Sequence, residues 1–146
     1  MSGNDESPMP YRFTFDTPTG LNENTPMTSS WEYNNIIFYA VNNQIFKLDF
    51  AAGQSTLIYS HPDASAEIVD LKMGVEGYVA VEGFSDYSQY EHPYSRCLGA
   101  AVNTKDGAGE LVVLQLNSAG KIDSDHKFPS TQVHKGFGKI KEIAFF

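Results

Sequence analysis

Beyond residue 30, most of the chain consists of short apolar runs or alternating apolar and polar residues, each interrupted by Gly, Asn or Pro. Short runs rich in β-branched and aromatic residues are typical of β-strands. An amphipathic helix would need apolar residues three and four apart over ten or more positions, and no window of the sequence has that spacing without Gly, Pro or a β-branched residue. The pattern therefore predicts an all-β fold.

The first three predicted strands form a meander. Residues 36–41 are a run of strand formers, followed by Asn42 and Asn43, whose side chains tolerate the positive φ of a tight hairpin turn. Residues 44–50 alternate as a half-buried strand does, and a small-residue turn with one glycine leads into a third strand over residues 55–59. We expect these three strands to be antiparallel neighbours.

A second set of strands is predicted in the remainder of the chain. Gly74 and Gly77 mark a turn between the first two of them, and residues 84–96 and 103–109 read as surface loops. The predicted strands cover residues 68–73, 78–84, 98–102, 111–116, 121–128 and 139–146.

An internal repeat relates the two sets of strands. Residues 45–54 align with residues 112–121, and residues 68–73 align with residues 140–145, both at an offset of roughly seventy residues. The order of strand, hairpin turn, strand, small-residue turn and strand is that of β-propeller blades, but about four to eight blades are needed to close a ring. We therefore expect a partial β-propeller-like fold of about two antiparallel blades with meander topology.

The domain boundary follows from the change in composition near residue 30. Residues 1–30 are rich in Pro, Asn, Thr, Ser and Glu and read as a linker-like segment with one short strand at residues 11–15. Residues 31–146 form the predicted propeller-like domain, with units of about 31–73 and 74–146.

Charge and cysteine content exclude some classes of function. Ten Lys and Arg against eighteen Asp and Glu give a formal charge of −8, which repels phosphate backbones, so we expect no nucleic-acid partner. Cys97 is the single cysteine and cannot form an internal disulfide. The first eight residues lack the features of a secretory signal. Taken literally this indicates the cytoplasm, but a piece of a longer exported protein would also lack a signal.

Three stretches carry a resemblance to a known family. Residues 36–59 read IIFYAVNNQIFKLDFAAGQSTLIY, residues 67–73 read EIVDLKM, and residues 136–146 read GFGKIKEIAFF. Together they resemble the C-terminal propeller-like region of the PKD-like family lipoproteins of Bacteroidetes. The resemblance implies a periplasmic or cell-surface lipoprotein, associated with glycan utilisation, that binds rather than catalyses. The chain has no lipobox cysteine and no recognisable PKD domain, so membrane anchoring is not implied.

The best candidate binding residues lie in the predicted loop over residues 84–96. Aromatic rings offer apolar faces to sugar C–H groups, and polar side chains on a loop can hydrogen-bond sugar hydroxyls. The alternative is that the tyrosines only pin a long loop against the sheet. The candidates are Asp86, Tyr87, Tyr90, Tyr94 and Arg96.

Signals for metal, phosphate or catalytic chemistry are absent or incomplete. The four histidines lack a zinc-binding spacing, and residues 123–126 lack the glycine and distant glutamate of a calcium loop. Residues 136–139 lack the full spacing of a phosphate-binding loop, and no Gly-x-Ser-x-Gly elbow is present. We expect no metal, no cofactor and no catalytic residue.

These observations favour a non-catalytic binding or scaffold module of an exported lipoprotein, which contacts glycan or a partner protein. Open blade faces would also allow self-association. One alternative is a structural fragment of a larger propeller with no ligand of its own. A less favoured alternative is a small hydrolase that uses carboxylates on inter-blade loops.

Overall fold

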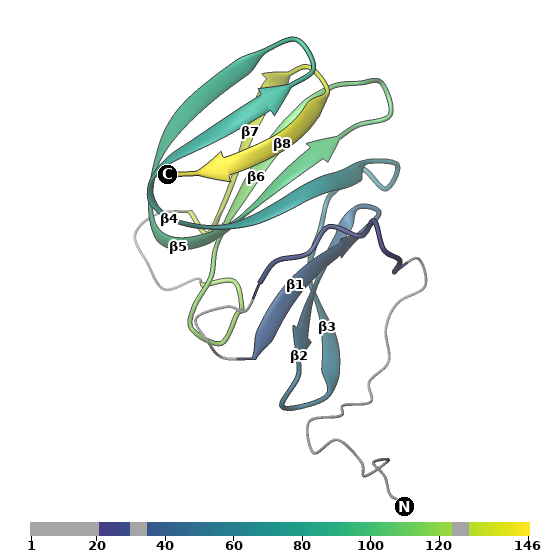
Figure 1. Ribbon diagram of the computed structural model, residues 1–146, viewed down its shortest axis with the longest axis vertical. Helices are drawn as coiled ribbons and strands as arrows, with labels where there is room; N and C mark the ends of the chain where they lie inside the picture. The colour runs from purple at the N-terminus through teal and green to yellow at the C-terminus, as the bar shows by residue number, and fades with distance from the viewer. Residues whose placement is uncertain (1–20, 30–34, 124–128) are drawn as a thin grey trace, which may run out of the picture.

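The computed structural model describes residues 21–29, 35–123 and 129–146, with only the backbone for residues 92–95. Within these residues the fold is all-β, as predicted, with two antiparallel sheets and no helix (Figure 1). A three-stranded sheet has the order β1-β2-β3, and a five-stranded sheet has the order β7-β6-β5-β4-β8. The strands are β1 (Ile36–Val41), β2 (Gln44–Asp49), β3 (Gln54–Ser60), β4 (Glu67–Gly83), β5 (Tyr87–Asn103), β6 (Gly109–Gln115), β7 (Thr131–Phe137) and β8 (Ile140–Phe145).

The small sheet confirms the predicted meander. Asn42 begins the β1–β2 turn with a φ of 55°, and Gly53 ends the β2–β3 turn with a φ of 66°. Asparagine and glycine adopt this left-handed region more easily than other residues, so the turns follow directly from the sequence. The pairing is regular apart from an extra residue, Ile58, in β3.

The large sheet is a curled half-barrel built on the long hairpin of β4 and β5, which have 17 residues each. Irregularities in the β4 register at residues 68–70 and 75–77 let the pair bend, because a bulge increases the local twist and bend of a strand. β8 pairs with the second half of β4, although the two are far apart in sequence. The large sheet is therefore not a simple meander, and propeller-like blades are not confirmed.

The predicted turn at Gly74 and Gly77 is wrong, because both residues lie inside β4. A Cβ on Gly74 would lie 2.4 Å from a ring carbon of Phe145, and a Cβ on Gly77 would lie 2.6 Å from the backbone oxygen of Phe146. These glycines do not turn the chain. They leave room for Phe145 and Phe146, at the end of the chain, to pack closely against β4. The expected unit boundary at residues 73 and 74 falls within this continuous strand.

The predicted surface loop over residues 84–96 is also wrong. Only residues 84–86 turn the chain, and β5 begins at Tyr87. The sequence reading missed β7, which includes Gly136. Of the strand expected over residues 121–128, Ile122 makes an isolated bridge to Leu116, and residues 124–128 lie outside the described residues. The short strand expected at residues 11–15 also lies outside them.

Apolar side chains fill three layers. The first layer lies between the small sheet and the convex face of the large sheet, where Phe38, Ile45 and Leu98 are fully buried. The second lies on the concave face of the large sheet, around Val79 and Leu111. The third lies on the outer face of the small sheet. The small sheet is therefore apolar on both faces.

Side chains seal the edge of β8 that faces away from β4. Asn103 at the end of β5 accepts a hydrogen bond from the Ile140 N–H through Oδ1 (2.8 Å) and donates one from Nδ2 to the Ile140 carbonyl (2.9 Å). Further along β8, the Ile143 N–H donates to Asp70 Oδ2, and its carbonyl accepts from Lys72 Nζ, both at 2.9 Å. These contacts tie β8 to the first half of the hairpin without a backbone ladder.

Candidate functional site

The second half of the β4–β5 hairpin, together with β8, has an outer face that the small sheet does not cover. Val79, Val81 and Ile143 point into the concave core, so the residues that alternate with them point outward. The register aligns these outward residues in three cross-strand rows. We call this surface the distal face; it consists of Tyr78, Ala80, Glu82, Tyr87, Gln89, Glu91, Glu142, Ala144 and Phe146.

Three aromatic rings stand on the distal face. Tyr78 is 44% exposed, and Tyr87 and Phe146 are each 60% exposed. The rings of Tyr78 and Phe146 stack with centroids 5.9 Å apart and an interplanar angle of 21°. Glu91 of β5 is the cross-strand neighbour of Tyr78, and Tyr87 lies four residues from Glu91 on the same strand. At the rise of an extended strand, four residues separate Tyr87 from the row of Tyr78 by about 13 Å. The face thus has an aromatic pair at one end and a single ring at the other.

Hydrogen-bonding groups lie between and beside the rings. Gln89 Nε2 donates to the Tyr87 hydroxyl at 2.9 Å, which helps to hold that ring in place. Glu82, Glu91 and Glu142 are exposed on the same face, and no Lys, Arg or His belongs to the distal face as defined. The face therefore combines apolar rings with hydrogen-bond acceptors, and its charge disfavours anionic ligands.

Of the residues predicted from the sequence, Asp86 and Tyr87 lie together at one end of this face. Asp86 is in the β4–β5 turn, where its carbonyl accepts the Gly83 N–H at 2.8 Å. Tyr90 does not join them, because it is three positions from Tyr87 on a strand and points into the concave side. Its ring stacks on His134 at 5.0 Å and meets Phe137 edge-on at 5.7 Å, which is a packing role.

Two predicted residues remain, Tyr94 and Arg96. Arg96 is partly buried opposite Val75, beyond the bulge in the hairpin, and Tyr94 lies among the residues described by backbone only. Conversely, sequence reasoning missed Tyr78, Gln89 and Phe146 as site residues. The period-two alternation of residues 78–82 is a usable signal, but it indicates a site only once the pairing with β5 and β8 is known.

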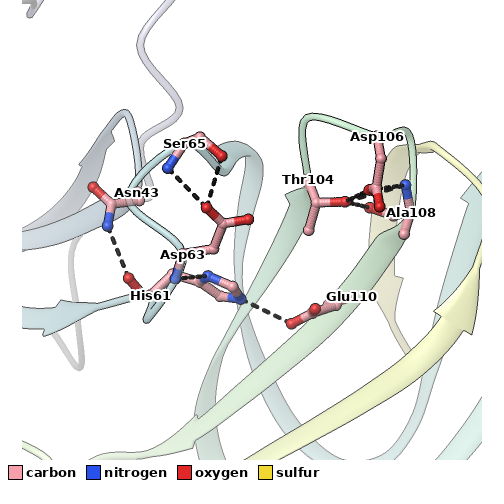
Figure 2. A network of polar contacts seen from close by, with 8 residues as sticks. All are labelled: Asn43, His61, Asp63, Ser65, Thr104, Asp106, Ala108 and Glu110. Carbon is pink, nitrogen blue, oxygen red and sulfur yellow. Dashed lines mark hydrogen bonds and ion pairs between the residues drawn. The ribbon is translucent and has the colours of Figure 1, made fainter.

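A second polar region lies between the connector after β3 and the β5–β6 turn (Figure 2). It is an open groove of about 380 Å³. At its base, His61 Nε2 lies 2.8 Å from Glu110 Oε1, and the side chains of both residues are largely buried. His61 Nδ1 accepts the Asp63 backbone N–H at 3.0 Å. The groove is lined by Asp63, Thr104, Lys105, Asp106, Ala108 and Glu110.

Hydrogen bonds occupy both nitrogens of the His61 imidazole. Because Nδ1 of His61 accepts an N–H, the ring proton is on Nε2 and is donated to Glu110. The Ser65 hydroxyl donates to Asp63 Oδ1 at 2.7 Å and not to the imidazole, so serine, histidine and acid do not form a relay. Both imidazole nitrogens are therefore occupied in structural bonds.

Two carboxylates of the groove stay ionised well below neutral pH. Hydrogen bonds from Ser65 lower the pKa of Asp63, and the Thr104 hydroxyl lowers the pKa of Asp106. Within the part of the chain that the structure describes, no three His, Cys, Asp or Glu side chains are arranged to hold a metal ion. We interpret the groove as a hydrogen-bonded junction between the two sheets.

Comparison with known proteins identifies no relative: no protein-family model, curated protein or solved structure matches this chain. The described residues contain no helix of the length and apolarity needed to cross a membrane. The exposed distal face is therefore the feature from which a function can be proposed.

Proposed function

We propose that this protein is a non-catalytic binding module that holds a neutral polysaccharide on the distal face. The observation that carries the proposal is the set of three exposed rings, Tyr78, Tyr87 and Phe146, on a sheet face that the small sheet leaves uncovered. Monomeric proteins expose extended apolar surface mainly where they bind something.

The chemistry of the face fits sugars. A pyranose ring has an apolar face of C–H groups that packs on an aromatic ring, and its hydroxyls donate hydrogen bonds to carboxylate and amide oxygens. Glu82, Gln89 and Glu91 supply such oxygens between the rings. An extended chain suits a face whose two aromatic ends are about 13 Å apart, because one small ligand cannot reach both.

The resemblance to PKD-like family lipoproteins and the exported location that it implies remain predictions, and glycan binding does not depend on them. The rival possibility is a structural fragment without a ligand. The rival predicts no binding to any glycan, so one screen separates the two.

The test is a screen of immobilised neutral polysaccharides followed by calorimetric titration of the best binder. Tyr87→Ala and Tyr78→Ala should each weaken binding about tenfold, the effect of losing about 1.4 kcal/mol of stacking and burial. Val133→Ala is the control, because Val133 is a 42% exposed apolar residue of β7, away from the distal face, and should leave affinity unchanged.

An acidic aromatic face could instead bind a cationic protein surface. The salt dependence of binding distinguishes this ligand from a neutral glycan. Binding of a neutral glycan should change little between low and high salt, and Glu82→Gln should be tolerated because the amide oxygen still accepts. The proposal fails if no neutral glycan binds. It also fails if Tyr78→Ala and Tyr87→Ala bind as tightly as the wild type, or if only Lys- and Arg-rich peptides bind and salt abolishes that binding.

A further inference from the structure

The two sheets have four edges, and two of them are covered. The segment at residues 26–28 lies along β1, where the Thr28 N–H donates to the Phe38 carbonyl (2.9 Å) and the Ala40 N–H donates to the Pro26 carbonyl (3.0 Å). The outer edge of β8 is sealed by Asn103, Asp70 and Lys72 as described above. Unpaired strand edges favour association, so sealed edges are the expected state of a stable monomer.

β3 forms a third edge and has little of the usual protection. In residues 21–29, 35–123 and 129–146, no backbone hydrogen bond is made to its outer side. Its sequence QSTLIYS has no charged residue, proline or glycine, although 19% of the chain is charged. Thr56 and Leu57 are exposed, and an open depression of about 330 Å³ runs along residues 53–56.

The fourth edge, β7, is different. It carries Lys135 and His134, and Gly136 has a φ of 96° within a register shift. A charge and a bulge are two of the devices that keep an edge strand from pairing. β3 has one such device, the bulged Ile58, which leaves residues 54–57 as a regular uncharged segment.

We propose that β3 pairs with β3 of a second copy of this chain, which joins the two small sheets into one six-stranded antiparallel sheet. A two-fold axis makes the same edge complementary to itself. The composition favours a second copy as the partner, because pairing an uncharged strand with its own copy brings no like charges together. Regular pairing is limited to residues 55–57, because Ile58 is bulged, so the interface is small and the dimer is weak.

The faces of the small sheet limit the register of this dimer, and we place its axis at Thr56. Ser55 and Leu57 pair with Leu48 and Phe46 and point to the outer face, whereas Thr56 points to the opposite face. Directly paired residues in a sheet share a face, so the two-fold axis must pass through a residue. An axis through Thr56 pairs Thr56 with its own copy and Ser55 with Leu57 of the other copy.

Sedimentation over a micromolar to millimolar series tests the dimer. The wild type should shift from monomer to dimer with concentration, and added salt should favour the dimer because each copy carries a formal charge of −8. Thr56→Glu should abolish the shift, because two carboxylates then oppose each other across the axis. Within one chain the new carboxylate lies beside Lys47, so the variant should fold.

Val133→Glu is the matched control, because it adds the same charge to an exposed residue of the other free edge. Thr56→Cys tests the register independently. Paired antiparallel residues have Cα atoms about 4.5–5.5 Å apart, which a disulfide spans, and the buried Cys97 does not compete. Oxidation should therefore give a covalent dimer of Thr56→Cys.

Three results would overturn the proposal. The first is a wild type that stays monomeric at every concentration, as it would if another segment of the same chain occupied the β3 edge. The second is a dimer that Thr56→Glu leaves intact. The third, a dimer sensitive to Thr56→Glu but not cross-linked in Thr56→Cys, rejects the axis through Thr56.

Discussion

Replacing Asn103 with alanine tests whether side chains hold the curled sheet closed. Asn103 is only 7% exposed, and it makes the two hydrogen bonds that satisfy the backbone N–H and carbonyl of Ile140. Ile140 itself is 1% exposed, so water has poor access to these groups once the amide is gone. The variant leaves two buried polar groups without partners.

The expected cost follows from those two groups. An unsatisfied buried donor or acceptor costs about 1–3 kcal/mol, so the pair should lower the free energy of unfolding by about 3 kcal/mol. Asn103→Asp is the matched control, because it keeps the shape and the acceptor for the Ile140 N–H but loses the donor to the Ile140 carbonyl. Because this change also places a buried carboxylate oxygen opposite the Ile140 carbonyl oxygen, its loss should be at least as large as that of the alanine variant.

Urea denaturation followed by far-UV circular dichroism measures these losses, and hydrogen exchange locates them. In Asn103→Ala the Ile140 amide should exchange much faster, whereas the Ile143 amide, which donates to Asp70, should keep more of its protection. A change below about 0.5 kcal/mol with a protected Ile140 amide would show that β8 is held by its pairing with β4 and by packing alone.

Three further measurements probe the concave core. Gly99→Ala should destabilise the protein by about 1–3 kcal/mol in the same assay, because the new Cβ would lie 2.7 Å from the Phe145 ring; a neutral result would mean that the ring moves freely. Burial lowers the pKa of His134 below its ordinary 6.5, so the unfolded state takes up the proton more readily. The contribution of the neutral His134 to stability is complete above pH 6.5 and is lost as the pH falls toward the pKa of the folded state. Over that range, the urea midpoint of His134→Gln should fall less than that of the wild type. An equal fall would contradict the lowered pKa of His134. Burial also raises the pKa of Cys97 to about 12, so the thiol should resist a disulfide reagent in the native protein and react in denaturant; fast native reaction would contradict this burial.

Local signals predicted the small sheet well. Its turns use Asn42 and Gly53, residues whose backbone preferences act within a few positions, and its strands are bounded by those turns. The same reasoning failed at Gly74 and Gly77, because glycine also occurs where another segment approaches closely. The segment that approaches them, around Phe145, is about seventy residues away, and nothing local to residues 74–77 indicates it.

The distal face was only partly predictable for the same reason. Aromatic and polar composition directed attention to residues 84–96, and Tyr87 lies on the exposed face. Composition does not say which face of a strand a side chain takes, so Tyr90 was grouped with Tyr87 although it packs in the core. Tyr78 and Phe146 join Tyr87 only through long-range pairing, which a single sequence does not encode in a readable form.

The position of β8 has a consequence for how the protein folds. The β4–β5 hairpin can pair locally, but the other edge of β4 stays without a partner until residues 140–145 have found it, across more than fifty intervening residues. Closing such a large loop costs entropy before any contact compensates it, so this step should limit the folding rate. During that interval, the apolar residues of β4 that later face the concave core, such as Val79 and Val81, remain exposed to solvent. Exposed apolar residues beside an unpaired strand edge favour misassembly.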